Sequence, residues 1–217
     1  WHDDLKKLEK KKKPILLATG ASNLKEVVAA VKVISKFNKD LVLMQCNTNY
    51  TNSFENLKYL NLSTISTFQN LFPNIVTGLS DHTQNDDVVL AAVSLGARVV
   101  ERHFTDSTKH VGPDHSFSTD IKSFKKLVEK VRRLEEMLGD GVKRVEPNEK
   151  DTIIVQRRSL YAKKNIFKGQ KIKREHIIPL RPCLPQALSA DSVKDIIGKK
   201  SKSNIRSGQI LKNKNFY

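Results

Sequence analysis

Two histidines at matching points of two short segments could together bind a metal ion. His82 lies in Gly78-Leu-Ser-Asp-His-Thr83, and His103 lies in Val99-Val-Glu-Arg-His-Phe104. Each histidine follows a short apolar run typical of a buried parallel strand, and the amphipathic stretch 86–95 separates the two runs. The carboxyl ends of consecutive parallel strands lie side by side, so we expect the two imidazoles to converge on one point. The pattern predicts a catalytic pocket with a divalent metal; hydrogen-bonded core histidines are the commoner alternative.

Other polar residues at the predicted strand ends could take part in the same chemistry. Glu101 precedes His103 by two positions, which places both side chains on one face of a strand. Glu101 could act as a general acid or base or as a partner of the metal ligands, or it could simply pair with a neighbouring cation. The hydroxyls of Thr19 and Ser80 suit a phosphate group, although loop capping would explain them equally well. Asp81 has the opposite strand parity and is expected to stabilise a loop.

The elements that must position these residues follow a repeated strand–helix order. We expect strands at 14–20, 41–47, 75–79 and 97–101, and helices at 23–37, 54–72, 86–95 and 121–138. This alternation predicts an α/β fold with a parallel sheet covered on both faces. Four such units form half of a (βα)₈ barrel or a small open doubly wound sheet. The sequence has neither a Gly-x-Gly-x-x-Gly fingerprint nor a Walker loop, which disfavours dinucleotide-binding and P-loop folds.

The region beyond Gly141 has a different character. A polar stretch, 141–157, is expected to be a linker, and 158–217 is expected to form a compact β-rich module. Asn165-Ile166-x-x-Gly169-Gln170 recurs as Asn204-Ile205-x-x-Gly208-Gln209, which predicts two equivalent strand–turn–strand corners.

Charge and composition restrict the possible partners of this 217-residue chain. Its formal net charge is +16, and the region from Gly141 onward holds 19 of the 39 Lys and Arg residues but 6 of the 23 Asp and Glu residues. The lysines are not interleaved with aromatic residues, so we expect no nucleic-acid partner; attraction of an anionic substrate explains the charge as well. We find no run of eighteen apolar residues and no secretory leader, so we expect no membrane partner and a cytoplasmic location. Cys46 and Cys183 are far apart and are expected to be buried, reduced thiols.

These motifs together resemble the C-terminal part of the sialic acid (nonulosonate) synthase family. The matching residues are Ala18-Thr19-Gly20, Gln45-Cys46-x-x-x-Tyr50, the two histidine motifs, Gly112-Pro113-Asp114-His115-x-x-Ser118, Leu138-Gly139-Asp-Gly141 and Arg158-Ser159-Leu160. The tail resembles the antifreeze-like SAF module, a β-clip fold, at Arg181-Pro182 and Ile197-Gly198-Lys199-Lys200. The resemblance implies the C-terminal half of a (βα)₈ TIM barrel at 1–140, a linker at 141–157 and a SAF domain at 158–217.

The resemblance also implies an activity. Enzymes of this family are metal-dependent transferases that form a carbon–carbon bond between phosphoenolpyruvate and an N-acetylated hexosamine, giving a nine-carbon acid and phosphate. By resemblance, His82 and His103 hold Mn²⁺ or a similar ion such as Mg²⁺ or Co²⁺. The expected catalytic residues are Glu101, Asp114, His82 and His103, and the expected substrate-binding residues are Thr19, Tyr50, Ser80, Asp114 and Arg181. Arg181 is expected to reach the partner's active site in a domain-swapped homodimer.

Two departures from the family qualify these expectations. Ala18 replaces a serine that is common in the family, and the first four barrel strands, with their phosphoenolpyruvate-binding lysines, are absent. Our hypothesis is that the chain is a fragment or split product, inactive unless an N-terminal half-barrel is supplied. The alternatives are a non-catalytic carbohydrate-binding or assembly subunit and a basic nucleic-acid-binding protein.

Overall fold

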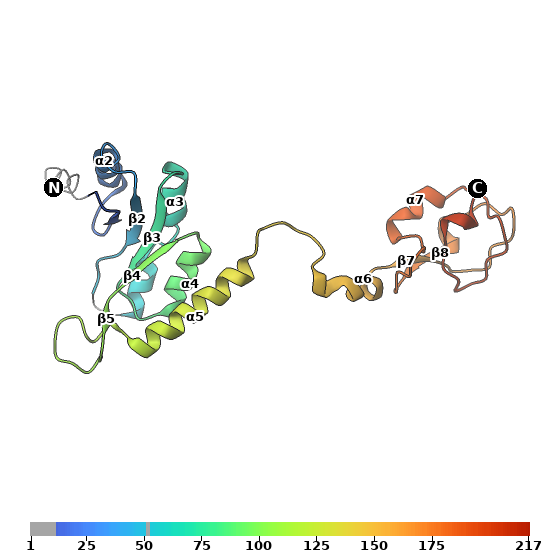
Figure 1. Cartoon of the computed structure of the whole chain (residues 1–217). Coiled ribbons are helices and arrows are strands. Elements are labelled where there is room, and N and C mark those ends of the chain that lie inside the picture. Colours follow the sequence, from blue (N-terminus) through green and yellow to red (C-terminus); the bar gives the residue numbers. More distant parts are fainter. Residues whose placement is uncertain (1–11, 51–52) are drawn as a thin grey trace. The chain divides into compact units, whose positions relative to one another are not determined.

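The computed structural model describes residues 12–50 and 53–217, which form two compact units. The first unit extends to Gly141 and the second runs from Val142 to Tyr217. Within the described residues, no helix is long and apolar enough to cross a membrane. Figure 1 shows the elements of each unit.

The centre of the first unit is a sheet of four parallel strands in the order in which they occur along the chain. The strands are β1 (Ile15–Ala18), β2 (Leu41–Cys46), β3 (Val76–Asp81) and β4 (Val99–Arg102). The helices between them are α2 (Leu24–Ile34), the 3₁₀ helix η2 (Phe54–Tyr59) with α3 (Thr64–Leu71), and α4 (Asp86–Ser94). Strands that follow one another and pair in parallel through helical crossovers are the arrangement of a barrel wall.

The two faces of this sheet have different surroundings. Leu41 and Leu43 of β2 pack with α2, and Leu79 of β3 packs with α4 and with α5 (Ile121–Leu138). The alternate residues face the other side, where they form rows across the strands. One such row contains Ala18, Met44, Gly78 and Val99, and another contains Cys46, Ser80 and Glu101. The helices described in residues 12–50 and 53–141 pack on the first side, and we call the second side the inner face.

Gly78 allows β3 and β4 to approach each other closely on the inner face. A Cβ atom at this position would lie 2.6 Å from the carbonyl oxygen of Val99 and 2.8 Å from Cγ of Met44. Both distances are too short for real Cβ contacts, so any side chain here would force the neighbouring strands apart. The glycine thus holds β3 and β4 together just before the histidine-bearing strand ends.

A small parallel ribbon follows β4 and holds the loop after it. Its strands are β5 (Phe104–Thr105) and β6 (Thr119–Asp120). The N–H of Thr119 donates to the carbonyl of His103 at 2.9 Å. This bond anchors loop 106–118 against the end of β4.

The structure differs from the sequence-based expectations in three places. The expected helix 54–72 is divided into η2 and α3, because Asn61 between them has φ +46°, a left-handed conformation that ends the first segment. The sequence predicted helices on both faces of the sheet, but the described helices pack on one face only. This is the arrangement in the wall of a barrel. The expected linker 141–157 contains the 3₁₀ helix η3 (Pro147–Glu149) and α6 (Lys150–Gln156).

The second unit is built mainly from short paired segments around one apolar core. Its elements are the antiparallel pair β7 (Ser159–Ala162) and β8 (Ile177–Leu180), the 3₁₀ helices η4 (Arg174–His176), η5 (Ala190–Ser192) and η6 (Asn213–Asn215), and α7 (Val193–Ile196). The predicted near-repeat is present as a reciprocal pairing. Ile166 and Ile205 exchange both backbone hydrogen bonds, Asn204 Oδ1 accepts from the N–H of Lys168, and Asn165 Oδ1 accepts from the N–H of Ser207.

Candidate functional site

His82 and His103 lie together at the carboxyl ends of β3 and β4. Their ring centroids are 5.2 Å apart, with 54° between the ring planes. Nδ1 of His82 lies 3.1 Å from the carbonyl oxygen of Asn47, which can only accept a hydrogen bond. Nδ1 therefore carries the hydrogen, and Nε2 keeps the lone pair that a metal ion or a proton would take.

Two aromatic rings enclose the histidine pair. The ring of Tyr50 lies 4.4 Å from that of His82 and 5.9 Å from that of His103, between centroids. Phe117 lies 5.0 Å from His103 and 5.8 Å from Tyr50, and it is buried. Sequence reasoning missed Phe117; its only signal was a large apolar residue in an otherwise polar loop.

Asp114 approaches the pair from loop 106–118. Its Oδ2 atom lies 3.6 Å from Nδ1 of His103, and both side chains are partly open to solvent. The backbone of the loop is fixed nearby, because the Asp114 carbonyl accepts from both the N–H and the hydroxyl of Ser118. The carboxylate is therefore held beside the imidazole, with its outer side facing solvent.

Ser80 and Glu101 are register neighbours on the inner face, each two residues before a histidine. Ser80 is buried and Glu101 is exposed. Cys46 completes this row on β2. Burial raises the pKa of the Cys46 thiol, and the charge of Glu101 adds to the rise, while a hydrogen bond with Ser80 opposes it. Cys46 is thus a neutral thiol beside the site, and sequence reasoning had given it no role there.

Asp81 and Arg102 form a buried ion pair on the helix-covered face, beneath the histidine-bearing ends. Asp81 Oδ2 lies 3.1 Å from Nε of Arg102, and the two side chains are 0% and 2% exposed. Burial raises the pKa of Asp81, with Arg102 opposing the rise. Asp81 Oδ1 also accepts from the N–H of Thr83 at 2.9 Å. As expected from its strand parity, Asp81 stabilises the loop after β3.

The other two expected substrate-binding residues have other described partners. The hydroxyl of Thr19 donates to the carbonyl of Met44 at 2.8 Å, and Thr19 lines pockets beside α2. Arg181 belongs to the second unit, where its Nε donates to the carbonyl of Gln156 at 2.7 Å. The first unit therefore brings together His82, His103, Tyr50, Ser80, Glu101 and Asp114, but not Thr19.

The donor set fits a metal ion that keeps open coordination positions. Within the described part of the chain, no group of three or more His, Cys, Asp or Glu side chains is arranged to hold a metal ion. The protein would supply two imidazoles, one of them already oriented by a backbone carbonyl, as is common for histidine ligands. Such a site leaves room for substrate oxygen atoms and water.

Comparisons with known proteins show which family the chain belongs to. The NeuB family model matches residues 1–143, and the SAF domain model matches residues 157–216. The chain belongs to the NeuB family. The family assignment agrees with the half-barrel architecture and with the SAF module at the C-terminal end.

Individual NeuB family relatives are similar over most of this chain. An uncharacterised protein of Methanocaldococcus jannaschii is 40% identical over 179 residues, which are 82% of this chain and 52% of that protein. The N,N'-diacetyllegionaminic acid synthase of Campylobacter jejuni is 33% identical over 211 residues, 96% of this chain and 61% of the synthase. The crystal structure of N-acetylneuraminic acid (sialic acid) synthetase from Leptospira borgpetersenii, in complex with citrate, matches with a TM-score of 0.63 and 26% identity. That match covers 70% of this chain and 52% of that one. The chain thus spans about half to three fifths of the length of these relatives.

Proposed function

We propose that this chain carries part of the active site of a sialic-acid-type synthase. The reaction would join C3 of phosphoenolpyruvate to the aldehyde carbon of an N-acetylated hexosamine. Addition of water at C2 and loss of phosphate would then give a nine-carbon acid. The observation that carries the proposal is the pair of strand-end imidazoles, 5.2 Å apart between ring centroids, in a chain of the NeuB family.

The residues around the pair have separate roles in this proposal. His82 and His103 would hold a divalent cation such as Mn²⁺, which when bound supplies Lewis acidity for the sugar carbonyl oxygen. Glu101, two residues before His103 and open to solvent, would move a proton at that oxygen. Ser80 would donate its hydroxyl to phosphoenolpyruvate.

The sugar would be positioned from the loop side of the site. Asp114 would accept hydrogen bonds from sugar hydroxyls, and Tyr50 would form the wall of the sugar pocket. Phe117 would fix the His103 and Tyr50 rings by packing against both. The role of Thr19 in phosphate binding rests on the resemblance alone, because its hydroxyl is engaged with the Met44 carbonyl.

Titration with manganese tests the metal site directly. We expect the wild-type chain to bind Mn²⁺ and the variant His82→Ala to lose that binding. The matched control is His110→Ala, since His110 pairs with Asp106 on an exposed loop and contributes nothing to the proposed site. Unchanged binding in His82→Ala would contradict the proposal and favour a non-catalytic carbohydrate-binding subunit.

An assay of phosphate release tests the reaction. Phosphoenolpyruvate and Mn²⁺ are supplied with N-acetylmannosamine or a diacetylated sugar, with and without the N-terminal half of a related synthase. We expect release only when the N-terminal half is present. A complemented chain that binds the metal but releases no phosphate with any of the sugars would contradict the synthase assignment.

The second unit would act across a homodimer. We propose domain bounds of 1–140 for the half-barrel and 158–217 for the SAF domain, with Arg181 of one subunit reaching the partner's substrates. The basic charge of the SAF domain supports this, because phosphoenolpyruvate and the product acid are anions. Light scattering should show a dimer. In the complemented enzyme, Arg181→Ala should raise KM, whereas Arg206→Ala should not.

We also propose a cytoplasmic location, where phosphoenolpyruvate is available.

A further inference from the structure

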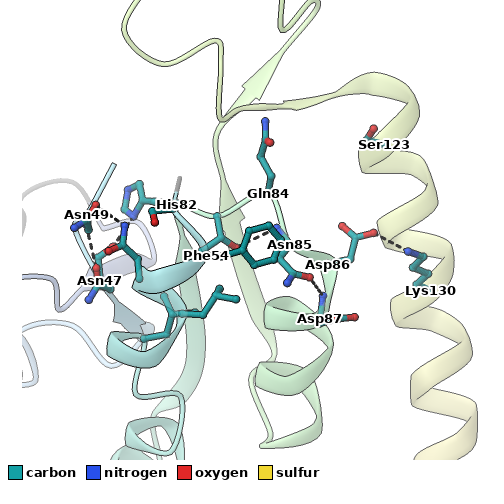
Figure 2. Close-up of a pocket in the computed structure, with 15 residues that line it drawn as sticks. Asn47, Asn49, Phe54, His82, Gln84, Asn85, Asp86, Asp87, Ser123 and Lys130 are labelled. Carbon is teal, nitrogen blue, oxygen red and sulfur yellow. Dashed lines mark hydrogen bonds and ion pairs between the residues drawn. The ribbon is translucent and has the colours of Figure 1, made fainter. Parts of the chain in front are cut away.

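A pocket of about 630 Å³ lies on the first unit, beside the histidine pair but largely separate from it. It is formed by the segment after β2 with η2, by the start of α4 and by the face of α5 that carries Ser123 and Lys130 (Figure 2). His82 belongs to its lining, whereas Tyr50, His103 and Asp114 do not. Its volume falls within the range of roughly 300–1,000 Å³ that is typical of small-molecule sites.

Five side-chain amides form a large part of the polar lining of this pocket. They come from Asn47, Asn49, Asn56, Gln84 and Asn85. Several are oriented by bonds to the chain: Asn85 Oδ1 accepts from the N–H of Asp87 at 2.9 Å, and Gln84 Nε2 donates to the carbonyl of Ser116 at 2.7 Å. An amide has two donor hydrogens and two acceptor lone pairs, so one bond fixes its orientation without exhausting its capacity. Oriented groups that both donate and accept suit hydroxyl groups, which do the same.

An exposed aromatic ring stands in the same pocket. Phe54 is 82% exposed and, in Figure 2, lies between the His82 end and the Asp86 end of the pocket. An exposed phenyl ring does not stabilise the fold by burial, but its π face can contact the C–H groups of a flat ligand. Leu57 and Leu60 add further apolar surface.

The charges of the pocket disfavour an anionic ligand. Asp86 pairs with Lys130 at 2.9 Å and with Arg102 at 3.3 Å, and Asp87 brings a second carboxylate. The pocket lining therefore holds two carboxylates and one ammonium group, because the Arg102 side chain is 2% exposed and does not line the pocket, in a chain whose net charge is +16. A phosphate or carboxylate ligand would lie close to these acids, whereas an uncharged ligand would not be repelled.

We infer that this pocket is a second ligand site, one that binds a neutral saccharide. The amides bind its hydroxyl groups, Asp87 accepts from a hydroxyl, and Phe54 stacks against the C–H face of the ring. The site does not depend on the metal centre, because only His82 is common to both.

Titration followed by residue-resolved NMR tests this inference. The probe is N-acetylmannosamine, added to the full chain in the presence of a chelator. We expect shifts in the side-chain amide signals of Asn56, Gln84 and Asn85. The variant Phe54→Ala should weaken binding roughly three- to tenfold, the effect of one aromatic contact. The matched control is Phe167→Ala in the second unit, where Phe167 is 64% exposed, and it should change nothing.

Further arms of the experiment separate this site from the proposed catalytic centre. His103→Ala should abolish metal binding there but leave the sugar-induced shifts unchanged. N-acetylmannosamine 6-phosphate should bind no more tightly than the neutral sugar. The inference is overturned if no pocket signal shifts, if the shifts occur only at Tyr50 and Asp114, if Phe54→Ala binds normally, or if the phosphorylated sugar binds better.

Discussion

The thiol of Cys46 belongs to the row of side chains that leads to the histidine pair. Because burial raises its pKa, the reactive thiolate is scarce at neutral pH. We expect Cys46 to react with iodoacetamide more slowly than Cys183, which is only partly buried. Mass spectrometry of timed samples measures both rates, and in urea the two should converge. Faster labelling of Cys46 in the folded chain would contradict the neutral, buried state.

The buried Asp81 carboxylate gives the first unit an unusual pH response. Its pKa is raised in the folded chain, so folding favours the protonated form. The stability that it contributes is full below the unfolded pKa of about 3.9 and is lost as pH rises through the folded value. As pH rises above about 3.9, the unfolding free energy of the wild-type chain should therefore fall relative to that of the Asp81→Asn variant. Urea denaturation at several pH values measures this; the opposite trend would mean that Arg102 outweighs burial.

Residue-level contacts around the site were only partly predictable. Strand parity in the sequence was enough to place Glu101 and His103 together and to turn Asp81 to the other face. The packing of Phe117 on His103 and the acceptor role of the Asn47 carbonyl could not be predicted, because both depend on how distant loops fold back. Thr19 shows the same limit: a hydroxyl at a strand end was predicted, but its bond to the Met44 carbonyl was not.

At the scale of elements, the capping residues at the helix ends determine where several helices begin and end. Helix α2 begins with a complete capping box, in which Asn23 Oδ1 accepts from the N–H of Glu26 and the Glu26 carboxylate accepts from the N–H of Asn23. Asn23→Ala should lower the unfolding free energy of the first unit by about 1 kcal/mol. Asn23→Asp should retain the cap and serve as the control. Chemical denaturation measures both, and equal effects of the two variants would contradict a capping role.

The same signals explain which element bounds could be predicted. Helix α5 was predicted over 121–138, its observed range, from its amphipathic pattern and from Gly139 after its end; the structure adds Asp120 as the residue that caps its start. The break between η2 and α3 was missed because Leu60 and Leu62 continue the apolar pattern through it. Only the backbone conformation of Asn61 reveals the interruption.

At the scale of the whole molecule, the two units should unfold independently. Residues 142–146, the first residues of the second unit, are exposed, belong to no helix or strand, and include Lys143 and Arg144. Brief trypsin treatment of the intact chain should cut there first and release two fragments that each keep a cooperative thermal transition. The double variant Lys143→Gln with Arg144→Gln should slow this first cut. A first cut inside the sheet of the half-barrel would contradict the division into two units.

The reciprocal asparagine bonds of the second unit restrict how that unit could have arisen and how it can be built. Asn165 closes the turn of the later half, and Asn204 closes the turn of the earlier one. The N–H groups of Lys168 and Ser207 each need an acceptor from the other half, so the first copy cannot complete its turn during synthesis until the second copy has been made. A single copy would need a second chain to supply the same acceptor.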